Sequence, residues 1–304
     1  MPGRAAVTGW RGVSMLWSGN ANRCPPRRPE AKENAVTNDS LGAAPEPSPQ
    51  IDTTVPHSAR IWNYWLGGTD NYPVDREAGD QYREVYPQIV DVARASRAFQ
   101  VRAVRYLTGE AGLRQFLDVG AGLPAVQNTH EVAQRIAPDS RVVYVDHDPE
   151  VVAHGRTLLR GAPPGTAEFI QADLHGPGEI LRAAAATLDF SQPVALMLMG
   201  VMGHIDDADA YPIVAHLVDG LPAGSYLALQ DGVLAGETFH EAQEGYDDTG
   251  AIPYRLRRPD QVAAFFDGME LVDPGVVPLP RWRPDPGQPG PDVDSVGGVA
   301  KKTT

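Results

Sequence analysis

The chain is poor in cysteine, in basic residues and in long apolar runs, and each shortage excludes a class of protein. Its 304 residues include one cysteine, Cys24, so an internal disulfide and a multi-cysteine metal site are excluded, and no bound metal is expected. The 39 Asp and Glu outnumber the 26 Lys and Arg, and the net charge of −13 argues against a nucleic-acid partner, because phosphate binding needs a concentrated basic face. No apolar run approaches the length of a membrane span, so we expect a cytoplasmic protein without membrane contact.

The beginning of the chain differs in composition from the rest. Residues 1–50 are rich in Pro, Gly and Asn, and residues 1–35 carry an excess of basic side chains. A short basic arm could grip a membrane surface or a nucleic acid, but this composition is more typical of a disordered extension. We therefore expect disorder over 1–50, and a biological translation start nearer Val36 than Met1.

Apolar periodicity predicts an α/β protein with a helical N-terminal element over 51–110 and a sheet domain over 111–304. Helices are predicted near 58–66, 75–84 and 88–107, the first capped by Ser58. From residue 115 strands and helices alternate, which is typical of a doubly wound parallel sheet. The predicted strands are 115–119, 141–146, 166–171, 193–200, 224–231, 271–279 and 295–301. These seven candidates predict a mostly parallel sheet whose C-terminal strand returns antiparallel at its edge.

Two neighbouring strand ends carry the pattern of a nucleoside site. The run Phe116–Val119 enters the turn Gly120-Ala121-Gly122, and glycines there let the backbone approach a ligand closely. A second apolar run ends at Asp146, whose two carboxylate oxygens suit the two hydroxyls of a ribose. We assign Asp146 and its neighbour His147 to the cofactor site, and Asp148, which precedes Pro149, to capping the next helix.

Asp118 decides which nucleoside is expected. A dinucleotide would bring a pyrophosphate to this turn, and a buried carboxylate would repel that anion. S-adenosyl-L-methionine brings an ammonium and a sulfonium instead, which favours this cofactor over a nicotinamide dinucleotide. The relaxed dinucleotide fingerprint also matches Gly120-x-Gly122-x-x-Ala125, and Asp118 could instead cap a turn or pair with an arginine, so both alternatives stay open.

The third strand end adds two candidates. Asp173 could accept a hydrogen bond from the adenine amine while Leu174 packs on the ring, or Asp173 could only cap a helix. Asn128 and Glu131 have the spacing of a capping box, so the helix after the glycine turn is expected to start late.

Several segments together resemble a bacterial family of S-adenosylmethionine-dependent methyltransferases that was long catalogued as a domain of unknown function. The resemblance covers most of the chain from about residue 50 and rests on Pro56–Tyr72, Phe116–Pro124, Asn128–Gln134 and Tyr144–Pro149. It implies a Rossmann-like core with a seven-stranded sheet, and N-terminal helices that form a lid over the cofactor. The lid would bring Gly67, Gly68, Asp70 and Asn71 near the methionine end of S-adenosyl-L-methionine.

The same resemblance places arginines near the methionine carboxylate and exposes two departures. Arg97, with Arg102, could meet that carboxylate, or both could be solvated residues of a helix face. The family commonly has a Leu-His-Phe-like triplet after the fourth strand and a Ser-His pair after the fifth. This chain has Val201–Asp206 and Gln230-Asp231 there, so the choice of acceptor, or turnover itself, is in question.

The function expected from the sequence is methyl transfer to a small-molecule acceptor that the residues do not identify. His204 is the candidate general base, with Asp206 and Asp231 behind it, although it could be an ordinary loop histidine. A cofactor-binding sensor without catalysis is the alternative, followed by a nicotinamide-dependent oxidoreductase. The oligomeric state stays open.

Overall fold

The computed structural model describes residues 51–160, 163, 166–234, 236–287 and 290–304, all within Pro47–Thr304, one of two units into which the chain divides. The expected disorder over 1–50 and the expected later translation start lie outside the described residues.

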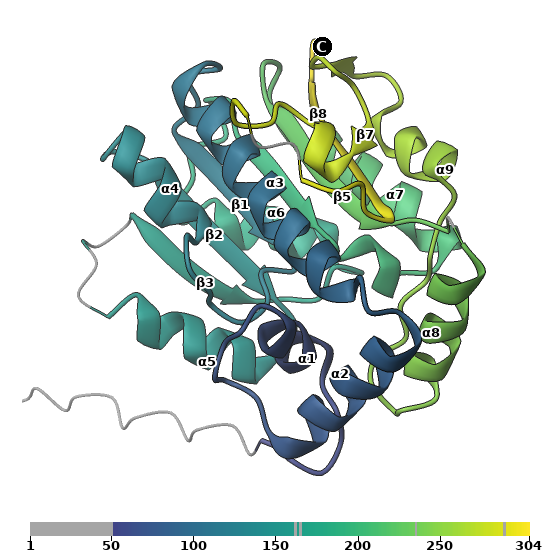
Figure 1. The fold of residues 1–304 in the computed structure, drawn as a ribbon. Helices are drawn as coiled ribbons and strands as arrows, with labels where there is room; N and C mark the ends of the chain where they lie inside the picture. Colours follow the sequence, from purple (N-terminus) through teal and green to yellow (C-terminus); the bar gives the residue numbers. More distant parts are fainter. Residues whose placement is uncertain (1–50, 161–162, 164–165, 235, 288–289) are drawn as a thin grey trace, which may run out of the picture. The chain divides into compact units, whose positions relative to one another are not determined.

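A mainly parallel sheet forms the framework of this unit, with its strands in the order β3-β2-β1-β4-β5-β8-β6 (Figure 1). The strands are β1 (Gln115–Val119), β2 (Arg141–Asp146), β3 (Ala167–Gln171), β4 (Ala195–Met199), β5 (Tyr226–Gly232), β6 (Glu270–Leu271), β7 (Val277–Pro278) and β8 (Ser295–Lys301). Strands β1 to β5 pair in parallel, whereas β8 runs antiparallel to β5, β6 and β7. The predicted doubly wound α/β class, with its antiparallel C-terminal strand, is confirmed.

The C-terminal part of the sheet differs in detail from the prediction. The apolar stretch 271–279 forms two short strands instead of one, because a turn at Asp273-Pro274-Gly275 interrupts it. Strand β8 lies between β5 and β6 instead of at the edge. This position suits its sequence, since Ser295–Ala300 are all buried and an edge strand would expose one side to water.

Helices cover both faces of the sheet, and alternate strand residues point to opposite faces (Figure 1). Phe116, Val142 and Met197 pack under α3 and α4, whereas Leu117 and Val143 face α6 and α7. The helices of these two layers and of the C-terminal region are α3 (Ile89–Gly109), α4 (Thr129–Ile136), α5 (Pro149–Leu158), α6 (Pro177–Ala184), α7 (Asp207–Asp219), α8 (Glu237–Asp247) and α9 (Pro259–Ala263). Within the described part of the chain, no helix combines the length and apolar character needed to cross a membrane.

Two short helices precede α3 and pack against each other. Helix α1 (Ser58–Trp65) starts at Ser58, so the prediction that Ser58 caps it is wrong: His57 is the N-cap and makes no side-chain capping bond. Helix α1 ends where Gly67 takes a left-handed conformation with φ 81°. Helix α2 (Pro73–Val85) contacts both α1 and α8. Helix α3, which we expected in the same N-terminal element, contacts α1 and α2 as well as α4 and the sheet.

A glycine on α5 provides a test of this packing. A Cβ added at Gly155 would lie 2.3 Å from Cζ of Phe169 on β3. We expect Gly155→Ala to destabilise the protein by about 1–3 kcal/mol through overpacking, despite the better helix propensity of alanine. Gly245→Ala on α8 is the matched control, because a Cβ there meets no atom within 4 Å. Urea unfolding should show the control variant unchanged or stabilised; equal effects of the two substitutions would contradict the packing argument.

Candidate functional site

The predicted site residues meet at a cavity along the carboxyl edge of the sheet. Its walls include the turn Gly120–Gly122 after β1, Asp146 and His147 at the end of β2, Met199–Val201 after β4, and Gln230 on β5. The cavity has a volume of about 210 Å³ and opens to solvent at its mouth. Open α/β sheets bind ligands at this edge.

The glycine turn after β1 needs both of its glycines, for different reasons. Gly120 has φ 74° and Gly122 has φ 65°, a region that side chains other than glycine rarely adopt. A Cβ on Gly120 would lie 2.3 Å from Cγ2 of Val201, so this glycine permits close packing of the β1 and β4 loops. A Cβ on Gly122 would meet no atom within 4 Å, which leaves open space next to its backbone. The turn can therefore admit a ligand at Gly122.

Asp146 links the ends of β1 and β2. Its Oδ2 accepts a hydrogen bond from Gly122 N (2.9 Å), and its Oδ1 accepts one from Asp148 N (3.1 Å). Burial raises the pKa of Asp146, which is 9% exposed. His147, also on the cavity wall, has Nδ1 3.6 Å from Asp146 Oδ1. Each carboxylate oxygen keeps a lone pair for a further donor, so the geometry suits a ligand diol.

Asp148 caps α5 as predicted. Its Oδ1 accepts from Glu150 N (2.6 Å) and Val151 N (3.2 Å), while its Oδ2 lies 2.9 Å from Nε2 of His57. Burial opposes ionisation of Asp148, but the bonds from His57 and from the first turn of α5 outweigh it and lower its pKa to about 2. Asp148 therefore carries a negative charge at neutral pH.

Asp118 is buried behind the glycine turn. Its Oδ2 accepts from Oγ1 of Thr129 (2.6 Å) and, at 3.4 Å, from Nε2 of Gln100. Burial raises its pKa to about 6, and the nearby Arg97 limits the rise. Asp118 neither caps a turn nor forms an ion pair among the described residues, so its charge is available to a cation in the cavity.

Arg97 and Arg102, expected to act together, have different surroundings. Arg97 lies on the cavity wall, where burial lowers its pKa, and its Nη1 donates to Oε1 of Gln100 at 2.8 Å. This is its one protein hydrogen bond among the described residues, so most of its guanidinium donors remain for an anionic ligand group. Arg102 is away from the cavity and donates to the carbonyls of Leu279 (2.7 Å) and Trp282 (2.9 Å).

The glycine-rich segment after α1 lies behind the cavity wall. Gly67, Gly68, Asp70 and Asn71 do not line the cavity, whereas Asn63 does. A Cβ on Gly68 would lie 2.4 Å from Nδ2 of Asn63, and Asn71 donates to Oδ1 of Asn63 at 2.9 Å. The segment thus supports Asn63 and makes no cavity contact itself.

Asp173 and Leu174 also lie outside the cavity wall. Asp173 accepts hydrogen bonds from the backbone and from Nδ1 of His175, and its side chain is 68% exposed. Leu174 is buried in the apolar layer that contains α6 and α7. The turn that we expected to hold adenine is therefore occupied by local contacts.

His204 lines the cavity on the side of β4 and β5. Its Nδ1 lies 2.9 Å from the carbonyl of Pro253, which can only accept, so Nδ1 carries the proton and Nε2 keeps its lone pair. Burial lowers the pKa of His204, which keeps the ring neutral at physiological pH. These are the properties of a general base.

The two carboxylates expected behind His204 are engaged elsewhere. Asp206 pairs with Arg255 at the surface. Asp231 is fully buried, accepts a hydrogen bond from the hydroxyl of Tyr254 and lies 3.4 Å from Nη1 of Arg257; burial raises its pKa to about 6. Neither carboxylate reaches His204, whose ring instead packs edge-on against Tyr254 with centroids 5.0 Å apart.

The sequence analysis missed several wall residues. Ser96 and Gln100 flank Arg97 on α3, and the hydroxyl of Ser96 accepts from Nε2 of Gln230 at 2.8 Å. Ser96 and Gln100 lie one and three residues from Arg97, which the sequence analysis had already singled out, and this proximity was a visible signal. His57 and Asn63 carried no such signal, because their roles depend on how α1 packs.

Much of the remaining cavity wall is aromatic. Trp65 and Tyr82 meet edge-on with centroids 5.1 Å apart, and Tyr82 meets Tyr246 at 6.0 Å. The aromatic residues of the wall are Trp62, Trp65, Tyr82, Phe239, Tyr246 and Tyr254. Of the Asp, Glu, Lys and Arg side chains in the described part, Arg97, Asp118 and Asp146 line the cavity, and all three belong to the end near β1 and β2. No group of three potential metal ligands gathers anywhere in that part of the chain.

Comparisons with known proteins identify the family to which the chain belongs. A search of curated proteins finds no match. A DUF574 family protein from Streptomyces avermitilis is 41% identical, with a TM-score of 0.78 over 83% of this chain and 100% of that one. A provisionally assigned methyltransferase from Thermobifida fusca is 37% identical, with a TM-score of 0.79 over 86% of this chain and 100% of that one. Residues 44–303 match the family described as S-adenosyl methyltransferase, and the chain therefore belongs to this S-adenosylmethionine-dependent family.

Proposed function

We propose that the protein methylates a small, mainly apolar acceptor that binds beside the methyl donor at the ends of β4 and β5. One observation carries the proposal: the charged side chains of the cavity come from α3 and the ends of β1 and β2, whereas its aromatic side chains come from α1, α2, α8 and the segment after α8. An anionic or phosphorylated acceptor would leave its negative charge uncompensated among those rings. A planar, uncharged molecule would bury apolar surface there and stack on them.

The residues at the charged end fit S-adenosyl-L-methionine. Asp146 would accept from the ribose hydroxyls beside the open backbone of Gly122, Asp118 would face the ammonium, and Arg97 would face the carboxylate. The ligand would neutralise charges that are costly to bury alone. A dinucleotide would instead bring an anion to Asp118, which disfavours the oxidoreductase alternative.

His204, on the cavity wall, suits an acceptor that gives up a proton. S-adenosyl-L-methionine supplies a methyl carbon that positive sulfur already activates for in-line displacement. The chain holds the two molecules in line and excludes water, and Nε2 of His204 takes the proton of an acceptor hydroxyl or amine.

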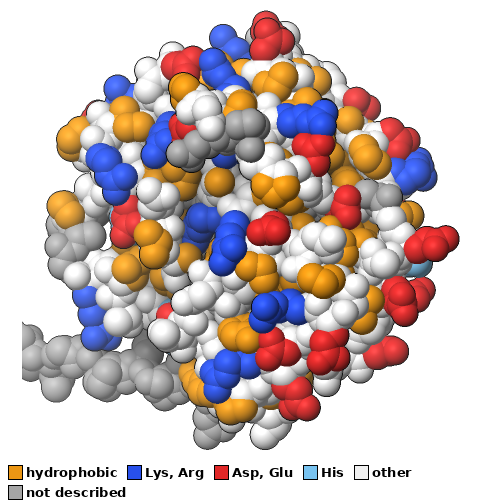
Figure 2. Space-filling view, in the orientation of Figure 1, with side chains coloured by type: hydrophobic (Ala, Val, Ile, Leu, Met, Phe, Trp, Pro, Cys, Tyr) orange, Lys and Arg blue, Asp and Glu red, His pale blue; other side chains and the backbone are white. Residues whose placement is uncertain are grey.

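The surface supports a small acceptor over a nucleic acid. Figure 2 shows Lys and Arg side chains interspersed with Asp and Glu on this face, with acidic side chains gathered toward the edge over α8. That helix exposes Glu237, Glu241 and Glu244. A phosphate backbone would need the opposite charge.

The first prediction concerns Asp146. Asp146→Ala should weaken binding of S-adenosylhomocysteine by about 1–3 kcal/mol, because two ribose hydroxyls lose an acceptor. Isothermal titration calorimetry measures this. Asp173→Ala, which removes an exposed carboxylate outside the cavity, should leave the affinity unchanged. The reverse pattern, with Asp173 sensitive and Asp146 silent, would move the nucleoside to β3.

The second prediction concerns the charge of Asp118. Its pKa is about 6, so it gains a proton as the pH falls from 7 to 5 and then attracts an ammonium less. S-adenosylhomocysteine should therefore lose more affinity over this range than adenosine, which lacks the ammonium. In Asp118→Asn, the affinities for S-adenosylhomocysteine and for adenosine should change equally between pH 7 and pH 5. If the wild type weakens equally for both ligands, Asp118 does not contact the ammonium.

The third prediction tests the acceptor and His204 together. Release of S-adenosylhomocysteine from S-adenosyl-L-methionine should be detected with members of a panel of uncharged aromatic hydroxyls and amines, and not with DNA or tRNA. His204→Ala should lower kcat by about 10²–10⁴-fold with little change in KM for S-adenosyl-L-methionine. His175→Ala, an exposed histidine outside the cavity, is the matched control.

Each alternative outcome of this experiment has a definite meaning. Tight cofactor binding without product from any acceptor would favour the non-catalytic sensor. Methylation of a nucleic acid would refute the proposed acceptor class. Full activity of His204→Ala would show that the acceptor reacts without a base at this position.

A further inference from the structure

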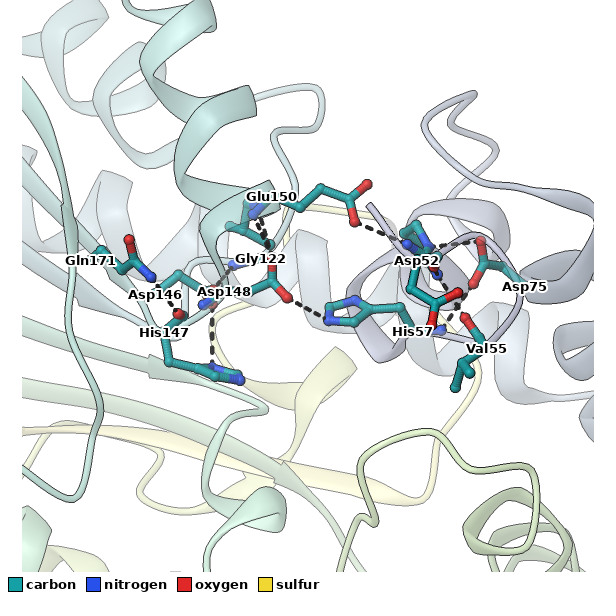
Figure 3. Close-up of polar contacts among 12 residues, drawn as sticks. Asp52, Val55, His57, Asp75, Gly122, Asp146, His147, Asp148, Glu150 and Gln171 are labelled. Atoms are coloured by element: carbon teal, nitrogen blue, oxygen red, sulfur yellow. Dashed lines mark hydrogen bonds and ion pairs between the residues drawn. The ribbon is translucent and has the colours of Figure 1, made fainter. Parts of the chain in front are cut away.

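A chain of hydrogen bonds connects the glycine turn to helices α1 and α2, which cover the cavity. Asp146 accepts from Gly122 N and from Asp148 N, and Asp148 Oδ2 lies 2.9 Å from Nε2 of His57. The backbone N–H of His57 donates to Oδ1 of Asp75, at the start of α2, at 2.9 Å. Figure 3 shows Asp146, Asp148 and His57 following one another from the end of β2 towards the covering helices.

A second, parallel connection fixes the same two parts of the chain. Arg60 on α1 is 2% exposed and donates from Nη1 to Oε2 of Glu150 on α5 (2.9 Å) and from Nε to Oδ2 of Asp75 (2.9 Å). Its Nη2 donates to the carbonyls of Asp52 and Val55. Arg60 thus fastens α1 whether or not His57 is present, so His57 is not needed to hold the helix in place.

The contact made by His57 has a more specific consequence. The Oδ1 of Asp148 is used by the first turn of α5, so Oδ2 is the oxygen that His57 can orient. The backbone N–H of Asp148 in turn donates to the carboxylate of Asp146. His57 and Asp146 both line the cavity.

We propose that His57 is a positioning residue that holds Asp146, through Asp148, in the orientation that accepts the ribose hydroxyls of the cofactor. This inference rests on the proposed role of Asp146. It predicts that binding of the nucleoside and attachment of α1 to the β2 loop reinforce each other, because both use the same chain of hydrogen bonds.

A thermodynamic cycle, in which the His57 side chain and a ribose hydroxyl are removed separately and together, tests this proposal. Binding of adenosine, 2′-deoxyadenosine and 3′-deoxyadenosine is measured by calorimetry for the full chain and for His57→Ala. In the wild type, removal of a ribose hydroxyl should weaken binding about fivefold or more, as expected for one lost hydrogen bond. In His57→Ala, removal of the same hydroxyl should weaken binding clearly less, because Asp146 is no longer held in the orientation that accepts from it.

Two further variants separate positioning from general loosening. His57→Gln, whose amide can still donate to Asp148, should restore the wild-type sensitivity to the ribose hydroxyls. Tyr64→Phe removes the hydrogen bond of similar length between α1 and Asp80 (2.8 Å) and should leave that sensitivity unchanged. Thermal unfolding of all variants identifies any that fail to fold; if His57→Ala does, Asp148→Asn replaces it in the cycle.

The outcomes distinguish this inference from the proposed function. If the wild type binds the three nucleosides equally, Asp146 does not hold the ribose and both proposals fail. If the wild type discriminates and His57→Ala discriminates equally well, the role of Asp146 stands and His57 is only structural.

Discussion

The hydrogen bond from Gly122 N–H to the carboxylate of Asp146 is the contact on which the site depends. It joins the turn after β1 to the end of β2, two strands that pair in parallel and therefore end at the same edge. Two backbone hydrogen bonds, from Gly120 N (2.8 Å) and Ala121 N (3.2 Å) to the carbonyl of Val145, hold the start of the turn against β2, and the Gly122 bond adds the link to the carboxylate itself. Since Asp148 N–H holds the second oxygen, both oxygens of Asp146 are oriented before any ligand arrives. The cavity is thus built around a carboxylate that the backbone positions in advance.

The buried charges near this contact explain why a zwitterionic nucleoside fits. Burial raises the pKa of Asp118 and Asp146 and lowers that of Arg97, so each charged form is disfavoured in the protein alone. No ion pair joins Arg97 to either carboxylate among the described residues, and the hydrogen bonds to the carboxylates and the nearby charge of Arg97 compensate only part of the cost of burial. A ligand that carries an ammonium and a carboxylate compensates both signs at once, whereas a diphosphate would help Arg97 and oppose Asp118. If these residues hold the cofactor as proposed, the site would select its ligand by the arrangement of charge as well as by shape.

The sequence predicts what depends on local pattern and misses what depends on packing. The strands around the glycine turn, the N-cap Asp148 and the bond from Asn128 N to Glu131 follow from neighbouring residues and are all present. The Gly67–Asn71 segment was expected to line the site, yet it contacts Asn63 behind the cavity wall. The position of this segment depends on how α1 packs, which local sequence does not reveal. For the same reason no pattern pointed to His57. Asp173 was expected from its place after β3, but a side chain and a backbone group two residues away bind it first.

The two segments that depart from the family pattern, Val201–Asp206 and Gln230-Asp231, contribute Val201, His204 and Gln230 to the cavity wall. The contacts that hold these segments bear on whether the acceptor site is intact. Arg257 is 1% exposed and donates to the carbonyls of Met202 (2.6 Å) and Ile205 (2.7 Å), so it fixes the loop that carries His204. A Cβ on Gly203 would lie 2.3 Å from the ring of Tyr254, whose hydroxyl is held by Asp231. Buried charges are costly. Here buried Arg257 holds the loop of His204, and a buried carboxylate holds the hydroxyl of Tyr254. A loop without a function would not need such contacts. These buried contacts support the proposal of a changed acceptor over a loss of acceptor binding.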